Sequence, residues 1–136
     1  MVEIDEQTLK YFKLAALQLI RVNDFEIFNL HVQKIGGLDT SQQDIETEPF
    51  EPGYIYIVQS IFAWCEGTGT PQIFVGIVDG TTFFIYNNGT VANAEDGVSY
   101  VGQLMCKETD KIRARFEGAT ATDTAHLYVN GYKIKV

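Results

Sequence analysis

The chain has 136 residues, with 18 Asp and Glu against 10 Lys and Arg, so its formal net charge is −8. A hydrophobic content of 46% with 21% charged residues is typical of one globular domain and excludes a disordered or collagen-like chain. The negative charge opposes binding to phosphate backbones, so no nucleic-acid partner is expected. The apolar runs are too short to span a membrane and the first residues are acidic, so we expect a soluble protein with no membrane partner and no export.

The first 22 residues have the apolar spacing of an amphipathic helix. Four apolar residues recur at intervals of three, four and three positions: Leu9, Phe12, Ala16 and Leu19. Asp5 is a suitable N-cap, and the helix is predicted to end near Val22. Its apolar stripe needs a partner, which is either the sheet of its own domain or a second copy in an oligomer.

A strand and a long acidic connector are predicted next. Apolar and polar residues alternate between Asn23 and Lys34, which favours one strand, and Gly36-Gly37 ends it. Residues 38–53 are predicted to form a loop. The connector carries five acids and no Lys or Arg: Asp39, Asp44, Glu46, Glu48 and Glu51. We interpret it as a solvated linker; the alternative is a strap that docks on a basic partner or holds a hard cation.

Residues 53–136 change to short strands separated by turn residues. Asp79-Gly80 is the strongest hairpin signal, because glycine accepts the positive φ of a two-residue turn, and Asn88-Gly89 predicts a second turn. Residues 111–116 alternate strictly, which predicts a half-buried strand of an antiparallel sheet. Gly131 marks either a bulge or a hairpin turn within the last strand.

The fold predicted from this pattern is mainly β. Six or so strands without intervening helices indicate an antiparallel β-sandwich at 53–136. Residues 1–52 are predicted to be a helix, a strand and an acidic connector that together form an N-terminal extended arm.

No residue has a recognisable catalytic setting. Ser41 lies in a polar segment, and neither His31 nor His126 is near a serine in the sequence. Cys65 and Cys106 are interpreted as buried free thiols rather than a disulfide, and the histidines lack a ligand spacing to them. We therefore expect no enzyme activity, no catalytic or metal-binding residue and no cofactor.

Aromatic residues crowd the first half of the predicted sandwich. Phe83 and Phe84 are adjacent, so in a strand they face opposite ways, one into the core and one toward a second layer. That layer is the N-terminal helix, a neighbouring subunit or a sugar. Trp64 and Tyr86 are the further aromatic candidates for such a contact.

Several short motifs follow one another along the second part of the chain, in residues 51–61, 75–80, 98–104, 109–120, 123–124 and 127–132. Their order resembles a family of small β-sandwich, jelly-roll-type proteins of tailed-bacteriophage virions. The resemblance begins near Pro52 and departs from the family at Thr109, where glycine is common, and residues 1–50 match nothing.

The resemblance implies a jelly-roll-like sandwich and a non-enzymatic structural protein of the virion. Its most plausible role is an auxiliary or decoration protein of the capsid, made in the host cytoplasm and not secreted. The implied partners are copies of itself, preferably in a homotrimer, and the major capsid or other virion proteins. If residues 1–52 form a reaching arm, deleting residues 1–50 should leave a soluble sandwich that no longer joins the particle.

Two other roles remain open: a host-receptor or glycan-binding module of a head or tail fibre, and a neck or tail-connector component. The interaction residues that we expect are Leu9, Phe12, Ala16, Leu19, Asp44, Glu46, Glu48, Trp64, Phe84 and Tyr86.

Overall fold

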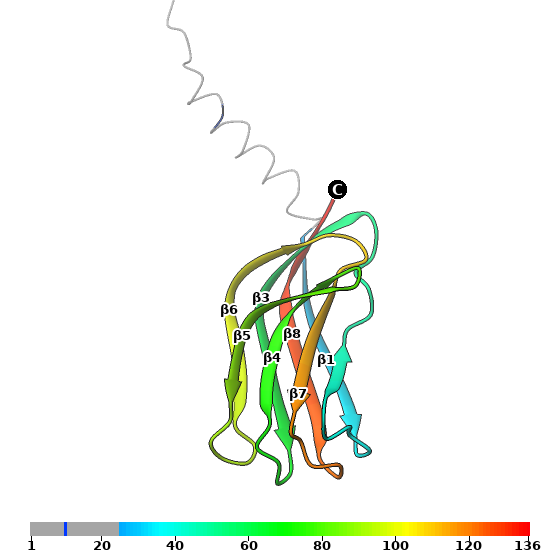
Figure 1. Ribbon diagram of the computed structural model, residues 1–136. Coiled ribbons are helices and arrows are strands. Elements are labelled where there is room, and N and C mark those ends of the chain that lie inside the picture. Colours follow the sequence, from blue (N-terminus) through cyan, green and yellow to red (C-terminus); the bar gives the residue numbers. More distant parts are fainter. Residues whose placement is uncertain (1–9, 11–24) are drawn as a thin grey trace, which may run out of the picture.

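The computed structural model describes residues 10 and 25–136. The helix predicted within the first 22 residues, with Leu9, Phe12, Ala16 and Leu19, lies outside the described residues apart from residue 10. The described chain forms eight strands (Figure 1): β1 (Phe25–Ile35), β2 (Gln43–Glu46), β3 (Tyr54–Glu66), β4 (Gln72–Asp79), β5 (Thr82–Thr90), β6 (Gly97–Cys106), β7 (Lys111–Glu117) and β8 (Thr124–Lys135).

The strands build two four-stranded sheets that pack as a sandwich. One sheet has the order β1-β8-β3-β6 and the other β2-β7-β4-β5, and all neighbours within them are antiparallel. Eight strands in this order form a jelly roll of two Greek keys. The prediction of a mainly β, antiparallel sandwich is thereby confirmed.

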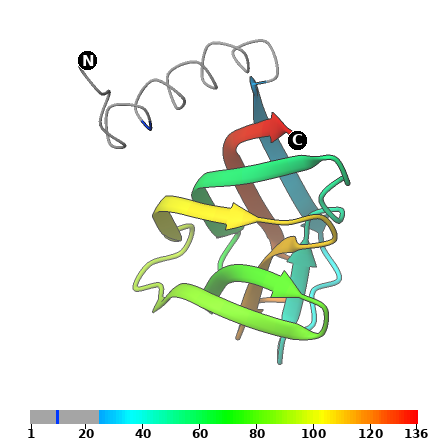
Figure 2. The ribbon, with the colours of Figure 1, turned by 90° about the horizontal axis from the view of Figure 1, so that it is seen from above.

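The topology gives the sandwich two different sides. The edge strands β1 and β2 lie on one side, and the edge strands β5 and β6 lie on the other (Figure 1). Strand β8 lies between β1 and β3, so the last strand of the chain pairs along its length with the first (Figure 2).

Residues 25–52 are part of the sandwich, which corrects the boundary expected at residue 53. Strand β1 pairs with β8, from Phe25 opposite Ile134 to Ile35 opposite Thr124, and the short strand β2 pairs with β7. The predicted loop 38–53 also supplies three buried core residues: Leu38, Ile45 and Phe50. Deleting residues 1–50 would therefore remove the strands β1 and β2 from the two sheets.

The core lies between the two sheets and follows the alternation of the strands. Ile112, Ala114 and Phe116 of β7 are fully buried, as their spacing predicted. On β3 the same parity buries Ile61, Ala63 and Cys65 while the intervening side chains face outward. The sequence pattern thus identified which face of β7 is buried.

Two of the predicted turns are placed differently. The hairpin between β4 and β5 has Gly80 and Thr81 as its loop residues, one position later than predicted, and Gly80 has a positive φ of 62°. The turn predicted at Asn88-Gly89 is wrong, because both residues pair with β4 inside β5. Gly131 is not a turn residue: it lies within β8 opposite Val58, where the β3–β8 register shifts at an irregularity in β3, and a Cβ there would overlap the main-chain carbonyl of Ile57.

Candidate interaction surfaces

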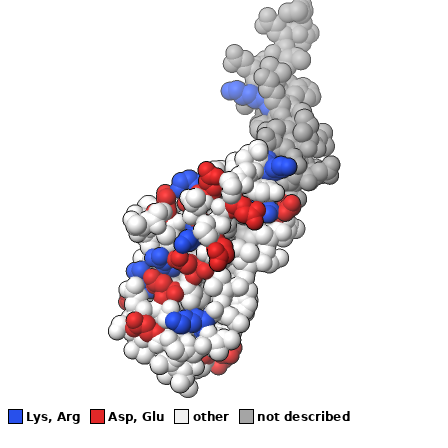
Figure 3. Space-filling view, turned by 90° about the vertical axis from the view of Figure 1, so that its right-hand side faces the viewer, with Lys and Arg blue, Asp and Glu red and all other residues white. Residues whose placement is uncertain are grey.

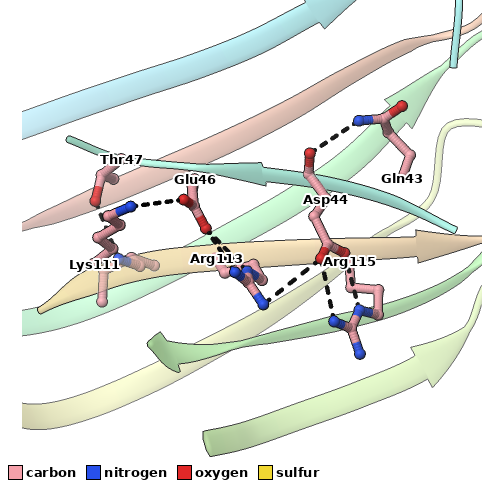
Figure 4. Close-up of polar contacts among 8 residues, drawn as sticks. Gln43, Asp44, Glu46, Thr47, Lys111, Arg113 and Arg115 are labelled. Carbon is pink, nitrogen blue, oxygen red and sulfur yellow. Dashed lines mark hydrogen bonds and ion pairs between the residues drawn. The ribbon is translucent and has the colours of Figure 1, made fainter. Parts of the chain in front are cut away.

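The acids of β2 are bound by cations from β7. The Asp44 carboxylate accepts hydrogen bonds from Nε and Nη2 of Arg115, at 2.9 and 3.1 Å (Figure 4). Glu46 accepts one from Lys111 Nζ at 2.9 Å and one from Arg113 Nε at 3.0 Å. These contacts follow from the register, which sets Asp44 opposite Arg115 and Glu46 opposite Arg113.

The ion pairs shift the pKa values of the groups that form them. Burial alone would raise the pKa of Glu46, but hydrogen bonds from Lys111 and Arg113 outweigh it, so the pKa is lowered from its ordinary value of 4.5. On the basic side of the network, the hydrogen bond to Asp44 raises the pKa of Arg115, because it stabilises the charged guanidinium. Asp44 and Glu46 thus meet basic groups of their own chain, and Figure 3 shows acidic and basic side chains intermixed on this side.

Glu48 lies apart from this network, on a groove at the β1/β2 side. The groove has a volume of about 310 Å³ and lies between β1 and the segment after β2, residues 47–51. Its floor includes Phe28, Phe50 and Tyr56, and the rings of Phe50 and Tyr56 are stacked with centroids 4.2 Å apart. Aromatic walls with a few charged groups at the rim are typical of a binding pocket at the small end of the usual range.

The outer face of the sheet β1-β8-β3-β6 is almost free of charge. Within the described residues, the register places Glu66 as the one Asp, Glu, Lys or Arg on this face. The face carries large exposed apolar side chains instead: Ile27, Ile35, Phe62, Val101, Met105 and Tyr128. In a chain with a net charge of −8, so large an uncharged face is a candidate interaction surface.

Trp64 belongs to this face, where it stacks on a column of rings. Its indole lies against His126 at 4.7 Å, and His31 stacks on Tyr128 at 4.3 Å. Nε2 of His31 and Nδ1 of His126 are 3.0 Å apart, and Nε2 of His126 lies 3.3 Å from Oε1 of Glu66. The two histidines are 95 positions apart in the sequence, so no local motif could have predicted this stack.

Phe84 and Tyr86 lie on the β5 edge, on the opposite side from the groove. Phe84 is 50% exposed and Tyr86 is 44% exposed, with Ile85 between them at 46%. Tyr86 has no partner in the β4 register, which marks a β-bulge at this position. Neither Phe83 nor Phe84 joins the buried core: Phe83 lies under the guanidinium groups of Arg113 and Arg115.

Sequence reasoning missed a buried polar centre at Asp123. Its side chain, 2% exposed, accepts hydrogen bonds from the main-chain N–H groups of Thr68, Gly69 and Thr120, at 3.0 to 3.1 Å. A carboxylate with this many donors is structural, since it holds the β3–β4 and β7–β8 connections together. The only signal for it was the ability of an Asp to bind nearby main-chain groups.

Both cysteines are free and buried, as interpreted from the sequence. Among the described residues no three His, Cys, Asp or Glu side chains are grouped as a metal site would need. The same part of the chain contains no helix of the length and apolarity that a membrane crossing requires.

No family model and no curated protein sequence matches the chain. Its fold is similar to solved structures at low identity. A chain of the cyanophage Pam1 capsid asymmetric unit is 15% identical, over 82% of this chain and 85% of that one, with a TM-score of 0.49. A pentameric capsid protein isolated from metagenomic phage sequences is 15% identical, over 100% and 79%, with a TM-score of 0.38. A CBM4 structure is 13% identical, over 81% and 94%, with a TM-score of 0.34.

Proposed function

We propose that this chain is a non-enzymatic structural protein of a bacteriophage virion, and that it decorates the capsid as a homo-oligomer, preferably a trimer. The observation that supports it is the uncharged outer face of the sheet β1-β8-β3-β6. Exposed Val101 (79%) and Met105 (72%) on β6 continue that face to the edge of the sandwich. The virion setting comes from the order of the motifs between residues 51 and 132.

The physical argument rests on what each outer face offers a partner. The outer face of the β2-β7-β4-β5 sheet has charges that already bind one another, so a partner would have to displace internal ion pairs. The opposite face presents apolar side chains with hardly any charge to desolvate. Binding a partner through that face therefore costs less desolvation than binding through the other face. Such binding needs no catalytic group.

The proposal is tested by adding the full chain to virions made without it and measuring how much sediments with the particles. Wild-type protein should saturate the particles, and the double variant Val101→Lys, Met105→Lys should bind at least tenfold more weakly. Both positions are exposed, so these changes leave the core intact. Gln42→Lys, an exposed change in the loop before β2, is the matched control and should bind like wild type. Wild-type protein that does not sediment with particles would overturn the decoration role.

A glycan-binding role on a head or tail fibre is the second candidate, and the ring column on the outer face favours it. Trp64, Phe62 and Tyr128 offer flat apolar surfaces of the kind on which sugar rings stack. Clean binding on a glycan array that is lost in Phe62→Ala, with unchanged thermal stability, would support this role over decoration. Trp64→Ala is the less clean variant because it also uncovers His126.

A neck or tail-connector role is distinguished by copy number. A ring of six or twelve copies in native mass spectrometry would support the connector, whereas three copies would support decoration or a fibre.

A further inference from the structure

The two sides of the sandwich carry features that complement each other. The β1/β2 side has the aromatic groove of about 310 Å³, and the β5/β6 side has the exposed cluster Phe84, Ile85 and Tyr86. The strands that carry them, β1 and β2 for the groove and β5 for the cluster, lie at opposite edges of the sandwich (Figure 1). One molecule therefore cannot fill its own groove with its own β5 edge.

The groove offers an aromatic surface with charged groups at its rim. The ring of Phe28 meets the rings of Phe50 and Tyr56 edge-on, with centroids 6.2 and 5.6 Å apart. The floor of the groove is therefore made of packed aromatic rings. Glu48 and Glu51 are exposed at the rim, and the half-buried Lys133, whose Nζ lies 5.9 Å from the ring centroid of Tyr56, also lines the groove. A ring inserted here would contact the aromatic floor and leave both carboxylates in water.

The β5 edge has less protection against pairing with another chain than most edge strands have. Natural edge strands are blunted with charges, prolines or bulges, and β5 contains no charged residue and no proline, only the bulge at Tyr86. The other sheet ends on this side with β6, which is also without charge. In contrast, β1 carries Glu26 and Lys34, and β2 carries Asp44 and Glu46.

We propose that the β5 edge of one copy docks into the β1/β2 groove of a second copy, with Phe84 and Tyr86 as the inserted side chains. This inference deepens the homo-oligomer of the proposed function and rests on it. The partner is a second copy because its β5 edge brings no charge toward the carboxylates at the rim, although the chain as a whole carries −8. Unlike surfaces meet in this contact, so it repeats from copy to copy, and we propose that the rotation between copies closes it into a ring rather than an open filament.

Sedimentation velocity of the full chain, without particles, tests the proposal. Wild-type protein should form a closed ring, with three copies as the expected number. Ile85→Lys places a charge on the β5 edge, and Glu51→Trp adds bulk from the exposed rim of the groove without touching the core. Each should raise the dissociation constant at least tenfold. Gln42→Lys, which lies in the exposed loop before β2, is the matched control and should retain the ring.

Mixing the two variants separates this contact from a symmetric one. The Ile85→Lys chain keeps its groove and the Glu51→Trp chain keeps its β5 edge, so the mixture should form pairs with one junction and no ring. A wild-type monomer would overturn the proposal, as would Glu51→Trp protein that assembles normally while Ile85→Lys does not. Because no particle is present, these results are independent of whether the protein binds virions.

Discussion

The thiol Sγ of Cys65 lies 3.3 Å from Oδ2 of Asp123, inside the end of the sandwich where the β3–β4 and β7–β8 connections meet. The main-chain carbonyl of the same Asp123 accepts a hydrogen bond from Gly36 N at 3.0 Å, just after β1. One residue therefore joins the ends of three strands, and its side chain has no room to move because Gly67 and Gly69 pack against it.

We predict that Asp123→Asn destabilises the fold by about 2–4 kcal/mol, because an amide nitrogen cannot accept the N–H bonds that the carboxylate now accepts. Chemical denaturation in urea measures the change as a lower midpoint with an unchanged slope. Asp96→Asn is the control, since its carboxylate binds exposed Asn93 only, and it should cost less than about 1 kcal/mol. Equal losses in the two variants would contradict a structural role for Asp123.

The two thiols should not react in the folded protein. Burial raises the pKa of Cys65 to about 12, with Asp123 adding to the effect, and burial followed by the charge of Asp110 raises the pKa of Cys106 to about 12. The thiolate is the reactive form, so both should resist Ellman's reagent at pH 8 and both should titrate in denaturant. Ser41→Cys, in an exposed loop, should react at once. Rapid labelling of the native thiols would show that the core opens readily.

The Glu46 ion pairs should make stability depend on acid pH. The pKa of Glu46 is lower in the folded protein, so its contribution is present above pH 4.5 and is lost as the pH falls through the folded pKa. At pH 7, Glu46→Gln should cost about 0.5–1 kcal/mol, as partly exposed pairs do. Melting temperatures of this variant and wild type should converge toward pH 3. Glu108→Gln, on an exposed turn, should keep the wild-type pH profile.

Thr109 has a positive φ of 71°, a conformation that a β-branched residue adopts at a cost. We predict that Thr109→Gly stabilises the protein by up to about 1 kcal/mol, because glycine adopts this φ without strain. The gain is limited because glycine loses more conformational freedom on folding than threonine does. Gly80→Ala, at a φ of 62° in the β4–β5 turn, should shift the melting temperature in the opposite direction. A lower melting temperature for Thr109→Gly would show that the threonine side chain stabilises the turn.

The sequence predicted local alternation well and distant pairing poorly. The strict alternation over residues 111–116 identified the buried face of β7, because a period of two is a property of a single strand. Asp44 and Glu46 were interpreted as solvated or partner-binding because their cations lie 65 to 71 positions away. Asn88-Gly89 has turn chemistry, yet pairing with Ile73 and Phe74 holds it in a strand.

The structure does not gather all the described interaction residues in one site but distributes them over four places. Asp44 and Glu46 are in the ion-pair network, Glu48 is at the groove, and Trp64 is on the outer face. Phe84 and Tyr86 are on the far edge. The groove could not have been predicted, since its walls come from β1, β3, β8 and the 47–51 segment, which only the jelly-roll topology brings together.

The position of β8 between β1 and β3 has a consequence for how the protein is made. Strand β1 lacks its pairing partner, and β3 lacks one of its two, until residues 124–135 have emerged from the ribosome, so the β1 side of this sheet cannot form before then. A nascent chain would wait with β1 unpaired and one edge of β3 open, and a frameshift before β8 would release a product prone to aggregate rather than a shortened but working subunit.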